Sequence, residues 1–172
     1  WHTSQVNTWS SSSLNTYLNG EYLTSLGTLA DKIATTTWKV GGWTYGNMET
    51  SVPKTAYQYE VGSSASTTTV DKKIGLMYIS DYGFAADQSG WTTKLSSYDS
   101  NTSKNWLYLG SYEWTISRDS NFANFAFYVD SDGYVYDNLV TNSFGVRPSF
   151  NLLSSVKYVS GSGSMSDPVR IN

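Results

Sequence analysis

The chain contains no cysteine, which excludes disulfide bonds, thiolate nucleophiles and cysteine metal ligands together. It has a single histidine, His2, close to the amino-terminal end. A Ser-His-Asp triad needs a histidine held within the body of the fold, and zinc needs several nitrogen or sulfur ligands. The sequence therefore argues against hydrolysis of that kind and against a zinc site. It indicates no catalytic residue, no metal and no cofactor.

Charged residues are also scarce, at 15% of the chain, with a formal net charge of -3. Lys72 and Lys73 are the only adjacent cations, so the basic footprint that phosphate neutralisation requires is missing. We therefore expect no nucleic-acid partner. No apolar run is long enough to cross a membrane, and the chain starts with neither a secretion signal nor Met. We expect no membrane contact by this domain, and a mature or amino-terminally truncated piece of a longer protein.

Aromatic residues are abundant instead, at 16% of the chain, and Ser, Thr, Asn and Gly replace much of the usual Lys and Glu. Rigid aromatic rings beside small polar groups are typical of paratope-like surfaces. We therefore expect a protein that works outside the cell or on the cell surface. Its 172 residues are enough to bury one hydrophobic core, so we expect a single domain over residues 1–172.

Two short helices are expected near the amino terminus, over residues 9–20 and 21–26. A serine would cap the first helix, and Gly20 would end it. Its apolar face, spaced for helical periodicity, comprises Leu14, Tyr17 and Leu18.

Strands dominate the rest of the chain. They are expected over residues 35–40, 73–79, 125–129, 134–136, 144–150, 156–159 and 167–171. Ser131-Asp132-Gly133 would form the hairpin turn between the third and fourth of these, and Pro148 would lie at an edge or bulge. Residues 43–69 and 89–104 carry weak signals and are expected as long connections. Helices followed by mostly antiparallel strands predict an α+β fold.

Arg147 lies in an otherwise apolar strand segment. A buried charge must be paired, and Glu113 is the predicted partner in a structural ion pair. Substrate binding by Arg147 is the alternative.

Acidic residues suggest two further sites that carry little specificity. Asp130 and Asp132 offer closely spaced oxygens that suit weak calcium binding, although a calcium cage needs six or more ligands. An ordinary Asp-Gly turn explains them as well. Glycoside hydrolysis needs a carboxylate pair, for which Glu113 with Asp119, Asp130 or Asp132 is the candidate.

Five segments carry a resemblance to a known family. They are WSSSSLNTYLNGEYL, EWTISR, YVDSDGYVYD, FGVRPSFNL and SGSGSMSDPVRI. Together they resemble a family of uncharacterised bacterial domains from secreted, cell-surface and pilin-like proteins, many from gut Firmicutes. That family is similar to the C-type lectin-like fold, whose formylglycine-generating-enzyme branch also ends in a Gly-Phe/Val-Arg-Pro/Val strand. The match runs from Trp9 to Ile171, and its Gly145-Val146-Arg147-Pro148 motif is the most specific part.

The resemblance implies a C-type lectin-like fold with two helices, a twisted antiparallel sheet, long loops and ligands bound on the strand-and-loop face. The enzymatic branch depends on active-site cysteines, which this chain lacks. True C-type lectins bind sugars through Glu-Pro-Asn or Gln-Pro-Asp loops with calcium, and neither motif is present. Neither activity is therefore carried over.

C-type lectin-like domains also serve as display scaffolds for diversity-generating retroelements, which mutate adenines, often in AAC or AAT codons. Mutated AAC codons cannot encode Lys, Glu, Gln, Trp or Met. These five types account for 25 of the 172 residues, yet none occurs within residues 119–144. Our hypothesis is that this segment is a diversified surface. The alternative is a strand-rich segment that disfavours these residues anyway.

The predicted function is a non-enzymatic ligand-binding or adhesion module whose partner is a host or bacterial surface protein or glycan. Tyr134 and Tyr136 share one strand face, opposite Val135, so we expect both tyrosines to be exposed. The predicted ligand-binding residues are Asp119, Asn121, Asn124, Tyr128, Tyr134, Tyr136, Asp137, Asn138 and Asn142. Two alternatives stay open: a structural pilus or surface-layer subunit, and a carboxylate-based enzyme.

Overall fold

Helices and small antiparallel sheets alternate along the chain in the computed structural model, which describes residues 1–172. The expected α+β class is confirmed. No helix combines the length and the apolar character that crossing a membrane requires.

The amino-terminal helical segment is longer than expected. Its consecutive turns are η1 (Trp9–Ser11), α1 (Ser13–Tyr17), η2 (Leu18–Tyr22), α2 (Leu23–Ser25) and η3 (Gly27–Lys32). Ser12 caps α1, because its hydroxyl accepts a hydrogen bond from the Asn15 backbone N–H at 3.0 Å. Gly20 was expected to end the helix, which was wrong: the chain passes through it in a π-helical turn, and Gly27 takes the positive φ of 56°. Tyr17 is 51% exposed and does not belong to the buried face.

Two helices occupy the region that was expected to be a long connection, so that expectation was wrong. They are α3 (Tyr45–Thr50) and α4 (Pro53–Glu60). The Thr44 hydroxyl caps α3 by accepting from the Asn47 N–H at 3.2 Å, and Pro53 occupies the first position of α4. Burial of Met48 and Ala56 anchors both helices.

The strand expected over residues 73–79 is shorter, because its last residue begins a helix. Strand β3 (Ile74–Leu76) stops early, and α5 (Ile79–Phe84) follows. The buried Glu60 carboxylate accepts the N–H groups of Ile79 at 3.0 Å and Ser80 at 2.8 Å, which satisfies the first turn of α5. Two 3-10 segments, η4 (Gln88–Gly90) and η5 (Leu95–Lys104), occupy the expected polar loop.

Four small antiparallel sheets replace the single twisted sheet that was expected. The paired strands are β1 (Thr36–Lys39) with β2 (Thr69–Lys72), β3 with β7 (Pro148–Phe150), β4 (Glu113–Arg118) with β5 (Phe125–Val129) and β6 (Val135–Leu139), and β8 (Tyr158–Ser160) with β9 (Arg170–Ile171). The β5 bounds and the hairpin turn are as predicted, whereas β6 continues to Leu139, beyond the expected end at residue 136. Strand β7 pairs with β3 rather than with this hairpin.

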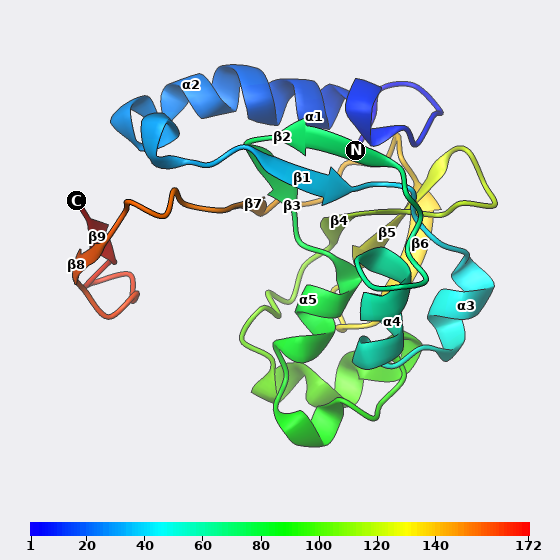
Figure 1. The fold of residues 1–172 in the computed structure, drawn as a ribbon. Coiled ribbons are helices and arrows are strands. Elements are labelled where there is room, and N and C mark those ends of the chain that lie inside the picture. Colours follow the sequence, from blue (N-terminus) through cyan, green and yellow to red (C-terminus); the bar gives the residue numbers. More distant parts are fainter.

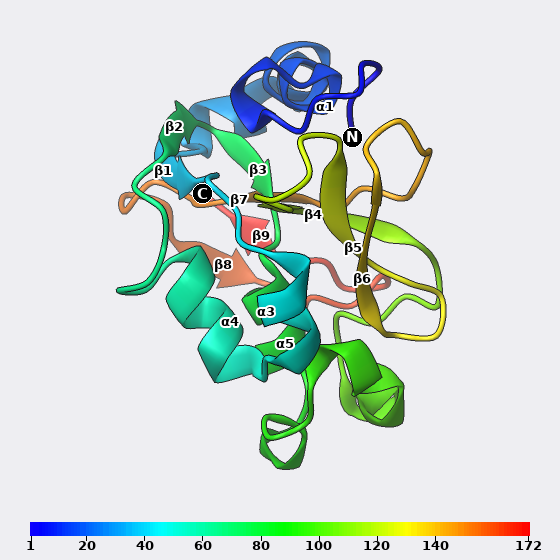
Figure 2. The same ribbon diagram turned by 90° about the vertical axis from the view of Figure 1, so that its right-hand side faces the viewer.

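The three-stranded sheet β4–β5–β6 separates two hydrophobic cores. Phe127 and Val135 belong to the core shared with α3, α4 and α5, while Ala126 and Trp114 belong to the core under the amino-terminal helices. Figure 2 shows this sheet with the amino-terminal helices above it and α3 to α5 below it. Both faces of the sheet are therefore largely buried.

The β8–β9 hairpin stands apart from the rest of the molecule (Figure 1). Its apolar side chains face solvent: Tyr158 is 66% exposed, Val159 60% and Val169 54%.

Candidate functional site

Strand alternation on β6 divides the predicted binding residues between two faces. Tyr136 lies opposite Tyr128 on β5, and Asn138 lies opposite Ala126, on the face toward the core under the amino-terminal helices. Asp137 points to the other face, opposite Phe127.

Most of the predicted residues keep access to solvent, but two do not. Asp119 has no exposed surface and Tyr128 is only 8% exposed, so their assignment to a binding surface was wrong. Both residues are buried because other parts of the chain cover both faces of the sheet. The alternation of side chains along a single strand does not show whether the second face is covered. Those that reach solvent, fully or in part, are Asn121, Asn124, Tyr134, Tyr136, Asp137, Asn138 and Asn142.

We call the accessible group around β6 the tyrosine-asparagine surface, and it comprises Tyr112, Tyr134, Tyr136, Asn138 and Asn142. The rings of Tyr134 and Tyr136 lie 5.8 Å apart, and Asn142 donates from its side-chain nitrogen to the Asn138 side-chain oxygen at 2.9 Å. Tyr112 is 47% exposed, and its ring stacks on Phe144 at 5.1 Å. The sequence prediction missed Tyr112, although its place directly before an aromatic strand was a usable signal.

The backbone beneath the two tyrosines is fixed by the hairpin turn. Asp130 accepts hydrogen bonds from the N–H groups of Asp132 at 2.9 Å and Tyr134 at 3.0 Å through one carboxylate oxygen. Gly133 takes the positive φ of 95° that this turn needs. Asp130 therefore acts as a turn residue. No three His, Asp or Glu side chains gather closely enough to hold a metal ion.

Asn142 also borders a hollow of about 370 Å³ between the amino-terminal segment and the loop that follows β6. Aromatic rings of Trp114, Phe144 and Tyr17 line the same hollow. The tyrosine-asparagine surface is thus continuous with a recess where a ligand group could lie.

Asp119 and Asp137 form a carboxyl pair behind the tyrosine-asparagine surface. One Asp119 oxygen, Oδ1, accepts from the Asn121 N–H at 2.7 Å, while the buried Oδ2 has no hydrogen-bond donor. Partial burial and the neighbouring Asp119 carboxylate raise the pKa of Asp137 from 3.8 to about 6. A proton on Asp137 removes the repulsion between the two carboxylates and supplies a hydrogen-bond donor to the pair.

Glu113 and Arg147 are paired in the structure. Arg147 donates from Nε to Glu113 Oε1 at 2.9 Å and from Nη2 to Oε2 at 2.6 Å. Nη2 also donates to the Leu107 carbonyl at 2.6 Å. This bidentate arrangement joins the start of β4 to the segment before β7.

Residues 1–154 match the model of the family described as Domain of unknown function (DUF6273). The chain belongs to this family. Nothing matches it among curated proteins or among solved structures. The whole tyrosine-asparagine surface and the Glu113–Arg147 pair lie within the DUF6273 domain, whereas the β8–β9 hairpin lies beyond the matched residues.

Proposed function

We propose that this DUF6273 domain is an extracellular ligand-binding or adhesion module with a C-type lectin-like scaffold. Its partner is a host or bacterial surface protein or glycan. The observation that carries the proposal is the adjacent pair of Tyr134 and Tyr136 at the start of β6, where the Asp130 turn holds the backbone in place. Both tyrosines were expected to be exposed, whereas both are partly buried and keep only part of their surface in contact with solvent.

Such a surface suits recognition for a physical reason. A tyrosine ring offers a large contact area and loses little conformational entropy on binding, while asparagine amides both donate and accept hydrogen bonds. The five side chains of the tyrosine-asparagine surface are all uncharged, which also spares a ligand the cost of removing water from charged groups.

Diversification by a retroelement, if it acts on this gene, would be confined to part of residues 119–144. Several of these side chains fill the two cores, where changes in volume destabilise a protein. The buried apolar positions are Ala126, Phe127, Tyr128, Val129, Val135 and Val140. Variation between related sequences should therefore concentrate at Asn121, Asn124, Tyr134, Tyr136 and Asn142.

Three of the four carboxylates considered for an enzyme are engaged or covered, which favours binding over catalysis; the fourth, Asp132, is exposed on the hairpin turn. Glu113 is held by Arg147, Asp119 has no exposed surface, and Asp130 closes a turn.

An array of glycans and of host and bacterial surface proteins tests the proposal. The double variant Tyr134→Ala/Tyr136→Ala should bind its ligand at least tenfold more weakly, because each ring is expected to contribute about 1 kcal/mol or more. Tyr57→Ala/Tyr158→Ala is the matched control, since both of its tyrosines are exposed elsewhere on the molecule. Equal binding by wild type and both double variants would contradict the proposed surface.

A structural pilus or surface-layer subunit is the second candidate, and the β8–β9 hairpin favours it. A two-stranded hairpin alone is marginally stable in water, and exposed strands pair with other chains. Concentration-dependent assembly that Tyr158→Ser/Val159→Ser abolishes, measured by light scattering, would support this candidate. A monomer at all concentrations would count against it.

A further inference from the structure

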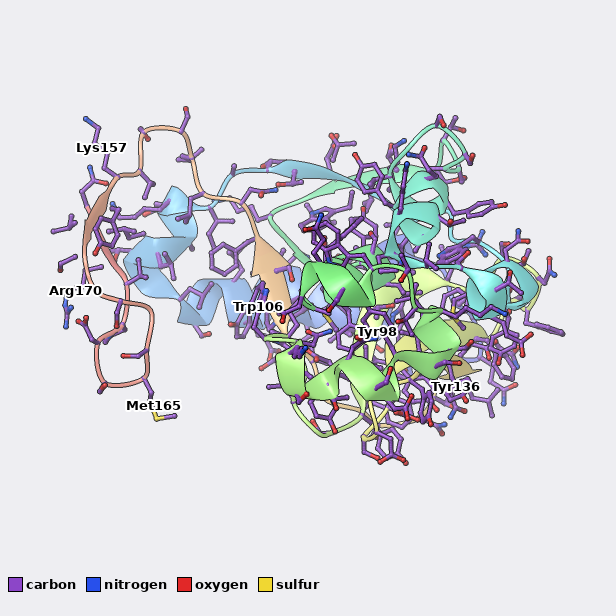
Figure 3. The ribbon with its side chains drawn as sticks, turned by 90° about the horizontal axis from the view of Figure 1, so that it is seen from below. Tyr98, Trp106, Tyr136, Lys157, Met165 and Arg170 are labelled. Atoms are coloured by element: carbon purple, nitrogen blue, oxygen red, sulfur yellow. The ribbon has the colours of Figure 1, made fainter.

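A second surface, distant from the tyrosine-asparagine surface, has the chemistry of a small-ligand site. Figure 3 shows Trp106 and Tyr136 well apart on the molecule. Trp106 borders a groove of about 360 Å³, near the small end of the usual range for ligand pockets. The lining residues are Met77, Asp81, Phe84, Ala85, Trp106, Leu107, Arg147 and Ser149.

The Trp106 side chain is 77% exposed, although its backbone is firmly held. The backbone N–H of Trp106 donates to the Ala85 carbonyl at 3.3 Å. The preceding residue, Asn105, donates from its side-chain nitrogen to the Tyr82 carbonyl at 2.8 Å. On the same groove, Phe84 packs edge-on against Trp91 at 5.1 Å. The groove thus has an aromatic wall that stands on a well-held backbone and faces water, an arrangement that leaves apolar area uncovered.

Polar groups on the groove have unused hydrogen-bonding capacity. Arg147 is locked by Glu113 and the Leu107 carbonyl, yet neither N–H of its Nη1 donates to any protein group. Asp81 accepts from the Tyr78 N–H at 2.8 Å through Oδ2, which leaves Oδ1 without a donor. Ser149 adds a hydroxyl to the lining of the same groove. The groove therefore offers fixed donors, a fixed acceptor and a hydroxyl beside an indole ring.

The charged residues on the groove indicate which class of ligand it can bind. Glu113 neutralises Arg147, and Asp81 adds a negative charge, so phosphate and other anions are disfavoured. A peptide side chain would use the aromatic wall but few of the polar groups. A sugar ring matches both, because its C–H face is apolar and its hydroxyl edge both donates and accepts hydrogen bonds.

We propose that the Trp106 groove binds a neutral carbohydrate, with a sugar ring lying on the indole and its hydroxyls reaching Arg147 Nη1 and Asp81 Oδ1. This site is independent of the tyrosine-asparagine surface. Binding at one can be lost while binding at the other remains.

Titration of the full chain with neutral oligosaccharides tests the proposal. Cellohexaose, maltohexaose, mannohexaose, xylohexaose and chitohexaose would be the probes, with calorimetry and tryptophan fluorescence as readouts. At least one should bind, Trp106→Ala should weaken that binding at least tenfold, and Trp106→Phe should retain part of it. Tyr158→Ala, which removes another exposed ring, should leave it unchanged.

Three outcomes would overturn the proposal. They are no binding of any of these saccharides, binding that survives Trp106→Ala, and tighter binding of dextran sulfate than of every neutral probe. Because Trp106 is largely exposed, its variants should fold, which the circular dichroism spectrum checks. Tyr134→Ala/Tyr136→Ala should leave saccharide binding intact, so a failure here is distinguishable from a failure of the proposed function.

Discussion

Arg147 and Glu113 share two parallel hydrogen bonds but differ sharply in exposure: the arginine side chain is 29% exposed and the glutamate side chain 4%. The glutamate thus depends on its partner much more than the arginine does. Water can reach the arginine once the pair is broken, but it reaches the glutamate poorly.

Substitutions at the two positions should therefore differ in cost. Arg147→Met leaves Glu113 buried and unpaired and should lower the free energy of unfolding by about 3–5 kcal/mol. Glu113→Gln leaves an arginine that can be hydrated and should cost about 1–2 kcal/mol. Urea denaturation at pH 7 measures both, and equal costs would contradict this account of the pair.

Stability should also respond to pH through Asp137. Its pKa is higher in the folded chain, about 6, than the ordinary 3.8, so the folded state binds more protons between these values. The stabilising contribution is complete below pH 4 and is lost as the pH rises through 6. The neighbouring titratable groups are Asp119 on the same face and, on α3, Tyr45 and Glu49.

Asp137→Asn should flatten this pH dependence. One pKa unit corresponds to about 1.4 kcal/mol, and solvent screening of a half-exposed group reduces the total effect to about 1 kcal/mol. Urea denaturation between pH 4.5 and 7.5 measures it. The exposed Asp132→Asn is the control, and a variant that keeps the wild-type slope would show that Asp137 is not the responsible group.

Glu60 supports the start of α5 from inside the protein. Besides the N–H groups of Ile79 and Ser80, it accepts a hydrogen bond from the Ser117 hydroxyl. Glu60→Ala should lower the free energy of unfolding by about 3 kcal/mol, because these buried donors lose their acceptor. Glu49→Ala, at an exposed site on α3, should change it by less than about 0.5 kcal/mol. Similar thermal midpoints for the two variants would rule out this role.

Two glycines should respond oppositely to alanine. At Gly133, with φ of 95°, an added Cβ would lie 2.3 Å from the Thr102 methyl group, so Gly133→Ala should cost about 2 kcal/mol or more. At Gly20, which is helical and has no atom within 4 Å of the added Cβ, alanine should stabilise by about 0.5–1 kcal/mol. Thermal denaturation of both variants measures the difference, and a neutral Gly133→Ala would contradict the turn geometry.

Local signals were enough to predict some features. The aromatic run of β5, the Asp-Gly turn after it and the charge in an apolar segment led to the hairpin and to the pairing of Arg147 with Glu113. Each depends on residue types with a strong local preference or on a charge that must be neutralised.

Other features depend on contacts between distant segments, which local patterns do not contain. Helices α3 and α4 are short and polar, and contacts with distant segments hold them in place. Met48 and Ala56 are buried in the core that α5 and β5 share, and Glu60 bonds to the first turn of α5. Tyr128 is buried because aromatic rings from outside its own hairpin, including Phe144 at 4.8 Å, cover it. Asp119 and Asp137 likewise lie close together because of the register of the sheet, which their spacing in the sequence does not contain.

The sheet β4–β5–β6 contributes side chains to both hydrophobic cores, so the unfolding of one core is coupled to the unfolding of the other. Neither core can unfold while the other stays folded, because each would lose the sheet against which its own side chains pack. A ligand bound near β6 would therefore stiffen the amino-terminal helices and α3 to α5 at the same time.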